Sequence, residues 1–180
     1  MPFAYYHRLT KAQKRIYDES DRVVTSATEL YRPELQRERV LALQAALESG
    51  ERASTERAAQ TLADGLTEAL GVPRLRIQLA ERRPSSQTGE LHGLYEADEE
   101  GHFKVSLWMR TAQRQQVVKF KTFLRTMLHE LGHHLDYQKL GLKDSFHTEG
   151  FYRRESSLLR QLFPGKASPR SRLRLPTAGL

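Results

Sequence analysis

The chain has 180 residues, a net charge of +7, 38% hydrophobic and 28% charged residues, and no cysteine. Such a length can bury a hydrophobic core, and the lack of cysteine excludes disulfide scaffolds and thiolate metal sites. Any bound metal would therefore need His, Asp or Glu ligands. No stretch approaches the ~20 apolar residues of a membrane span. The first residues lack the apolar segment of a signal peptide, so we expect a cytoplasmic protein.

The first part of the chain, residues 1–71, is predicted to be a helical N-terminal region. Apolar residues recur at helical spacing over 9–30, and further helices are expected over about 35–47 and 55–70. Nothing in these residues points to catalysis. We expect them to support the rest of the protein or to contact a partner.

Strand patterns begin at residue 72. Residues 75–79 and 102–109 alternate between apolar and polar side chains, and 90–96 is a shorter candidate. One long helix is then expected over 111–140, and a last helix over 148–163. These elements indicate an α+β fold, in which a small, mainly antiparallel sheet packs on a helix.

The end of the chain, residues 164–180, is predicted to be a disordered basic tail, because it contains Pro, Ser and four basic residues but no acidic one. This tail contributes much of the net charge, so the folded part is only mildly basic. Binding to nucleic acid is therefore possible but weakly supported.

The chemically informative segment is the run His129-Glu130-Leu131-Gly132-His133, which lies inside a predicted helix. Residues four apart share one helical face, so both imidazoles can reach one metal ion. Glu130 follows the first histidine and can approach a water on that metal without ligating it. This HExxH pattern predicts a zinc site, since His-rich sites favour zinc among divalent ions.

A catalytic zinc usually has three protein ligands and one open position. His147, at the start of the last helix, is the favoured third ligand. Glu155 is the alternative ligand, because it is a carboxylate on a largely apolar face, and it could instead accept a hydrogen bond from a liganding histidine. Asp136 is a weaker candidate that fits the same supporting role.

These residues resemble compact zincin metallopeptidases of the SprT-like, WLM and YgjP-like kind. The resemblance covers about residues 72–163 and depends on the HExxH helix, on His147 followed four residues later by Phe151, and on the preceding strands. It implies a zincin-like fold, with His129, His133 and His147 as zinc ligands and Glu130 as the catalytic base. The zinc-ribbon cysteines of many SprT-like proteins are missing, which leaves the subfamily open.

The expected reaction is hydrolysis of a peptide or protein substrate. Zinc would activate a water molecule and polarise the carbonyl group, Glu130 would take the proton, and the strand over 102–109 would pair with the peptide. The oxyanion donor is expected among Tyr137, Tyr152, His134 and Arg153.

Two other interpretations compete with this one. The first is a zincin-fold binding module for nucleic acid or protein, in which the zinc is structural. The second is a histidine cluster that is satisfied within the core and binds no metal. We consider this second interpretation the weakest, because burying clustered histidines without a metal costs free energy.

Overall fold

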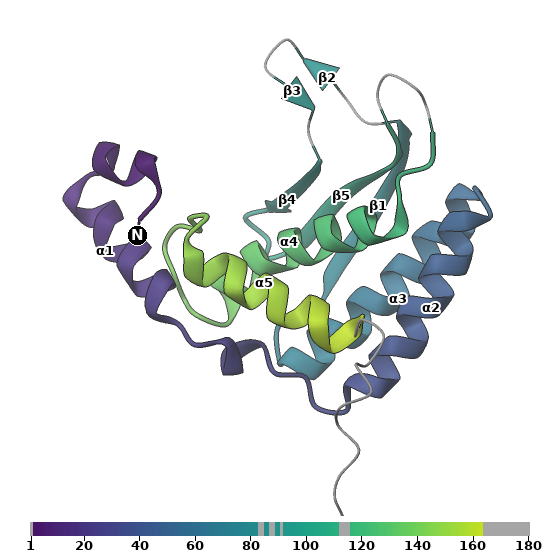
Figure 1. Cartoon of the computed structure of the whole chain (residues 1–180), viewed down its shortest axis with the longest axis horizontal. Helices are drawn as coiled ribbons and strands as arrows, with labels where there is room; N and C mark the ends of the chain where they lie inside the picture. Colours follow the sequence, from purple (N-terminus) through teal and green to yellow (C-terminus); the bar gives the residue numbers. More distant parts are fainter. Residues whose placement is uncertain (1, 83–84, 87–88, 91, 112–115, 164–180) are drawn as a thin grey trace, which may run out of the picture.

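A computed structural model describes residues 2–82, 85–86, 89–90, 92–111 and 116–163, and shows an α+β fold (Figure 1). The α+β prediction is therefore confirmed. The predicted basic tail, 164–180, lies outside the described residues. The elements in chain order are η1 (Ala4–Arg8), α1 (Lys11–Arg22), η2 (Thr25–Thr28), α2 (Pro33–Glu48), α3 (Arg52–Leu70), β1 (Leu75–Arg82), β2 (Ser85–Ser86), β3 (Gly89–Glu90), β4 (Gly93–Ala97), β5 (Phe103–Arg110), α4 (Phe120–Gln138) and α5 (Glu149–Leu162).

The helical stripe predicted over 9–30 is interrupted. Helix α1 begins at an N-cap, Thr10, whose side chain accepts a hydrogen bond from the backbone of Gln13, and it ends at Arg22. The next residues, Val23 and Val24, have extended backbones. Adjacent β-branched residues lose side-chain freedom in a helix, which explains the break. Helices α2 and α3 match the predicted ranges to within a few residues.

The main sheet has the strand order β1-β5-β4 and is mixed. Strand β5 pairs with β4 in the antiparallel sense but with β1 in the parallel sense. The prediction of a mainly antiparallel sheet is thus wrong in part. Alternation of side chains shows which face of a strand is buried, and it says nothing about the direction of its neighbour. Strand β4 forms an edge of this sheet, and β5 lies in its centre.

Helix α4 begins at Phe120, nine residues later than predicted. The backbone N–H of Val118 donates to the carbonyl of Met109 over 2.8 Å, so this part of the chain still runs beside the end of β5. Val117 and Val118 are β-branched and favour such an extended backbone. The helix proper therefore starts only after them.

Helices α3 and α4 pack against the sheet, and α2 and α5 pack on these helices (Figure 1). Leu75, Ile77 and Leu79 of β1 are buried, and Arg76, Gln78 and Ala80 between and after them are exposed. A single apolar cluster joins the buried face of the sheet to the helices, so it includes residues on both sides of the boundary predicted at residue 71. Its members from different elements include Leu43, Leu66, Leu107, Leu128 and Leu158.

Helix α1 lies to one side of the molecule, beside the start of α5 (Figure 1). Among the helices of the described ranges, none combines the length and the apolar character needed to cross a membrane.

Candidate metal centre

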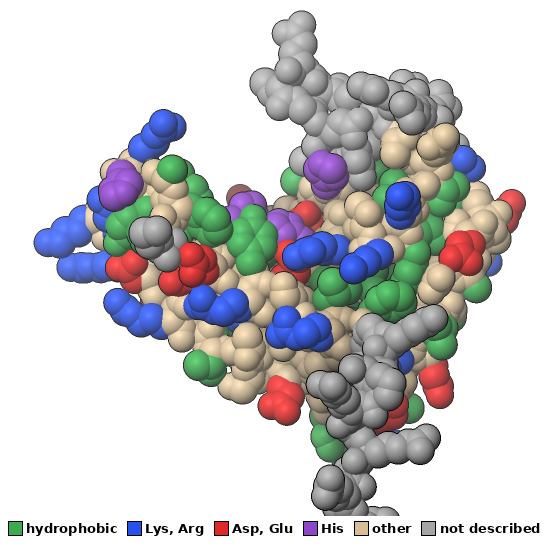
Figure 2. Space-filling view, viewed as in Figure 1, with side chains coloured by type: hydrophobic (Ala, Val, Ile, Leu, Met, Phe, Trp, Pro, Cys, Tyr) green, Lys and Arg blue, Asp and Glu red, His purple; other side chains and the backbone are tan. Residues whose placement is uncertain are grey.

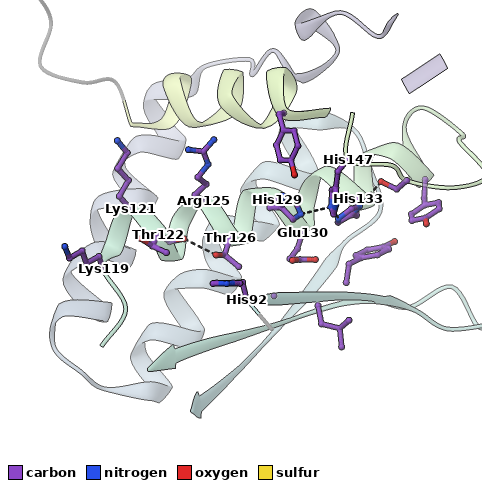
Figure 3. A pocket seen from close by; sticks show the side chains of 16 residues that line it. His92, Lys119, Lys121, Thr122, Arg125, Thr126, His129, Glu130, His133 and His147 are labelled. Atoms are coloured by element: carbon purple, nitrogen blue, oxygen red, sulfur yellow. Dashed lines mark hydrogen bonds between the residues drawn. The ribbon is translucent and has the colours of Figure 1, made fainter. Parts of the chain in front are cut away.

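Three imidazoles meet at one point beside helix α4 (Figure 3). The Nε2 atom of His147 lies 3.0 Å from Nε2 of His129 and 3.1 Å from Nε2 of His133. His129 and His133 come from consecutive turns of α4, and His147 comes from the loop before α5. The structure thus brings together the three residues that the sequence nominated as metal ligands.

The ring of His129 is oriented by Glu155. Its Nδ1 lies 3.0 Å from a carboxylate oxygen of Glu155, whose other oxygen accepts a 2.6 Å bond from Nε of Arg125. A carboxylate only accepts, so His129 carries its proton on Nδ1 and turns the lone pair of Nε2 towards the other imidazoles. Burial alone would raise the pKa of Glu155, but hydrogen bonds from His129 and Arg125 lower it. Glu155 therefore supports a ligand instead of joining the cluster.

The ring of His133 is oriented by a longer, buried chain of contacts. Its Nδ1 lies 2.7 Å from Oγ of Ser145, which in turn donates to Asp136 over 2.8 Å. Because the Ser145 hydroxyl donates its proton to Asp136, its oxygen must accept a hydrogen bond from Nδ1–H of His133. The Nε2 atom of His133 is therefore unprotonated, like that of His129. Arg154 completes the chain, with a 2.8 Å bond to Asp136 and a 2.7 Å bond to the carbonyl of Ser20 in α1.

The position of His147 is fixed from two sides. Tyr5 donates its hydroxyl to the carbonyl of His147 over 2.9 Å. Burial, followed by the nearby Tyr17 and Tyr152, raises the pKa of Tyr5 to about 12, which keeps this hydroxyl protonated. On the other side, Thr148 caps helix α5 by accepting a hydrogen bond from the backbone of Phe151.

The donor set suits a divalent cation such as zinc. With Zn–N distances of about 2.0–2.1 Å, tetrahedral geometry puts two ligand nitrogens about 3.3 Å apart, close to the separations found here. Two bare nitrogen atoms at such a distance repel each other unless a proton or a cation lies between them. Burial, then His129 and His147, lowers the pKa of His133 to about 3, so this ring is neutral at pH 7. Neutral imidazole is the form that binds metal.

Glu130 lies buried beside the cluster, beneath strand β4. A Cβ atom built on Gly93 would lie 2.9 Å from the carboxyl carbon of Glu130, so any side chain at position 93 would force Glu130 to move. The backbone N–H of Tyr95 donates to the same carboxyl group. Burial raises the pKa of Glu130 against the opposing effects of His129 and Tyr95.

The imidazoles and Glu130 open onto a cleft of about 970 Å³. Figure 2 shows histidine side chains in a hollow of the surface, with Lys and Arg side chains next to them. Gly93, Leu94 and Tyr95 of the edge strand β4 line this cleft. Strand β5 is paired on both sides. The prediction that residues 102–109 bind the peptide is therefore wrong, since a central strand has no free edge.

Of the four candidates for the oxyanion donor, two line the cleft and two do not. Tyr137 and Tyr152 both line the cleft, whereas Arg153 does not and donates to the backbone of Asp21. The ring of Tyr152 lies 5.9 Å from that of His147. His134 is fully buried, and its Nε2 lies 2.9 Å from the carbonyl of Pro73, so it faces the core and not the substrate.

Several supporting residues were missed by the sequence analysis. Ser145, Arg125 and Arg154 are ordinary polar residues in sequence, and only their three-dimensional contacts show what they do. Gly93 had a usable signal, because a glycine inside a strand often marks a close approach of another group. His92 is exposed and also lines the cleft, and nothing in the sequence singled it out.

Comparison of the chain with protein-family models, with curated proteins and with solved structures found no match.

Proposed function

We propose that the protein is a zinc-dependent metallopeptidase with a zincin-like fold. The observation that carries this proposal is the arrangement of three imidazole Nε2 atoms around one point, beside a buried glutamate in an open cleft. The resemblance of the HExxH segment and of His147 to compact zincins of the SprT-like, WLM and YgjP-like kind supports it. His129, His133 and His147 would hold the zinc.

The composition of the cluster favours a catalytic site over a structural one. Structural zinc sites are usually closed by four protein ligands, whereas catalytic sites keep one position open. In the described ranges, no fourth His, Asp or Glu ligand atom joins the three imidazoles within 4.8 Å, and all members of the other group of candidate ligands, Asp98, Glu100 and His102, are exposed. The open position therefore faces the cleft.

The bound zinc would supply Lewis-acid activation of a water molecule and of the scissile carbonyl. Glu130 would act as the general base, accepting a proton from the attacking water and later passing it to the leaving amine. Its burial and its contact with the Tyr95 backbone hold it at one position beside the imidazoles. Glu155 and Ser145 keep both Nδ1 protons in place during the reaction.

The peptide binds along the free edge of β4. An extended peptide can form backbone hydrogen bonds with such an edge, which here lies directly above Glu130.

We assign the oxyanion donor to Tyr152, because its ring contacts the imidazoles, whereas Tyr137 stacks on Tyr95 with ring centroids 5.9 Å apart. Replacing Tyr152 by Phe should lower kcat by about 10²-fold, and Tyr137→Phe is the matched control.

The decisive experiment compares the unmodified protein with Glu130→Gln on an unfolded protein substrate. We expect one zinc per chain in both proteins, and a loss of hydrolysis of about 10²–10⁴-fold in the variant. Glu96→Gln is the control, because this exposed glutamate pairs with Lys104 away from the cleft. Equal rates for Glu130→Gln and the unmodified protein would refute the proposal.

The competing function is a binding module in which the zinc is structural and the ligand is nucleic acid or protein. Such a module would keep its binding activity in both Glu130→Gln and His147→Ala. Its affinity for nucleic acid would also fall steeply with salt if many phosphates were contacted.

A further inference from the structure

Basic residues continue the line of metal ligands along helix α4. Lys121, Arg125, His129 and His133 follow each other at intervals of four residues, so they share one face of the helix. Figure 3 shows these side chains along the cleft, with Lys119 at the start of the helix. One end of the cleft therefore carries the imidazoles and the other end carries cations.

The charge at this end is available to a ligand. The side chains of Lys119 and Lys121 are exposed and form no ion pair with another residue that the structure describes. Arg125 contacts Glu155 through Nε, but 52% of its side chain remains exposed. Glu130 is the only acidic residue among the described residues that line the cleft, and it lies at the imidazole end. A net positive potential results at the start of α4, where the partial positive charge of the helix N-terminus adds to it.

We infer that this end of the cleft is an anionic subsite that selects peptide substrates with acidic side chains. The inference rests on the proposed peptidase function, and it adds the chemical class of the substrate. Carboxylates of the peptide would pair with Lys119, Lys121 and the exposed part of Arg125. The rest of the peptide would lie along β4.

The spacing of the cations sets where the acidic residues lie. A helix rises about 1.5 Å per residue, which puts Arg125 and Lys121 about 6 and 12 Å from His129 along the axis. An extended peptide advances about 3.3 Å per residue. The preferred acidic side chains are therefore about two to four residues from the scissile bond, on one side of it only.

A peptide fits this cleft better than a nucleic acid does. The three cations lie in one short line that suits two or three separate carboxylates. A nucleic acid strand carries a phosphate at every nucleotide, and along the same path it would bring further negative charge against Glu130. The free edge of β4 offers backbone hydrogen bonds, which only a peptide can complete as a strand.

The test measures binding without requiring hydrolysis. Zinc-loaded Glu130→Gln protein is titrated at low ionic strength with two fluorescent peptides, one with a pair of Glu residues three positions from its centre and one with Gln in their place. We expect the Glu peptide to bind about 5- to 10-fold more tightly, because two exposed ion pairs form. High salt should remove this difference, since it screens exposed charges.

A matched pair of variants then locates the subsite. In the same background, Lys119→Gln with Lys121→Gln should abolish the preference, and Lys119→Arg with Lys121→Arg should restore it. Lys11→Gln with Lys143→Gln removes two exposed charges that do not line the cleft, so it should leave the preference intact. Thermal unfolding of each variant shows whether it is folded.

Three results would overturn the inference. The first is equal affinity for the Glu and Gln peptides. The second is equal loss of preference in the Lys119/Lys121 variant and in the control. The third is displacement of the Glu peptide by a single-stranded oligonucleotide that binds more tightly at the same residues. If the preference is found but the unmodified protein cleaves neither peptide nor unfolded protein, the subsite stands and the peptidase proposal fails.

Discussion

His129 and His133 lie one turn apart on α4, yet the contacts that orient them differ in kind. The partner of His129 is Glu155, whose own partner, Arg125, is 52% exposed. His133 is held through Ser145 by an ion pair between Asp136 and Arg154, whose side chains are 0% and 5% exposed. Water can replace Arg125 but cannot reach Arg154. The contacts that orient these two imidazoles thus differ in how much they contribute to folding.

The difference matters because the buried pair also connects separate elements. Arg154 of α5 contacts Asp136 of α4 and the Ser20 carbonyl of α1. Removing one member of a buried ion pair leaves an uncompensated charge, whereas removing an exposed one changes little. We therefore expect substitutions among the residues that support His133 to lower the free energy of unfolding. Substitutions among the residues that support His129 should lower mainly the affinity for metal.

The largest effect is expected from Asp136→Asn, which leaves the buried guanidinium of Arg154 without its charged partner. The free energy of unfolding of the metal-free protein, measured in urea, should fall by roughly 3–5 kcal/mol. The control is Asp98→Asn, whose carboxyl group is 52% exposed beside His102, and it should change the free energy of unfolding little. Similar small losses for both variants would remove the distinction between the two supports.

A smaller effect is expected from Ser145→Ala, which removes the hydroxyl between His133 and Asp136. One carboxylate oxygen and one imidazole N–H lose their partner, so unfolding should become easier by about 1–3 kcal/mol. Zinc affinity, measured against a competing chelator, should fall by about 10- to 100-fold. Ser156→Ala, on α5 outside the cleft, is the control. Unchanged zinc affinity would show that Ser145 does not orient His133.

On the other side, Glu155→Gln keeps an oxygen that can accept from His129 but removes the negative charge. Zinc affinity should fall by up to about tenfold, with little change in the free energy of unfolding, because Arg125 can turn to water. A loss of zinc affinity greater than that of Ser145→Ala would reverse the expected order of the two supports.

The smallest effect is expected from Arg125→Gln. The Glu155 carboxylate is only 2% exposed, but it keeps its hydrogen bond from His129 when Arg125 is removed, and the guanidinium itself is half exposed, so the loss of stability should be about 1 kcal/mol. Calorimetric unfolding with and without zinc measures this directly. A destabilisation comparable to that of Asp136→Asn would mean that the contacts orienting His129 and those orienting His133 contribute equally to the free energy of unfolding.

The sequence predicted the part of the site that is local. His129, Glu130 and His133 are related by helix geometry alone, so their arrangement follows from their spacing. His147 was found from the clustering of histidines and from the family resemblance. The pairs Arg154–Asp136 and Arg125–Glu155 were missed, because each joins different helices and depends on how these pack.

The fold, too, could be predicted from the sequence only where it depends on local patterns. Periodicity located α2, α3 and the buried faces of β1 and β5. It did not show that β1 runs parallel to β5, and it assigned the extended residues 116–118 to a helix. Strand direction and helix start depend on contacts made at the end of β5, which no local pattern records.

Under the proposed function, the glycine above Glu130 separates the catalytic base from the metal ligands. Any larger residue at position 93 would have to displace the carboxylate, while the imidazoles, which lie outside this contact, keep their own supports. Gly93→Ala would then give a protein that binds zinc and does not hydrolyse peptides. Such a protein would be a trap for capturing the natural substrate.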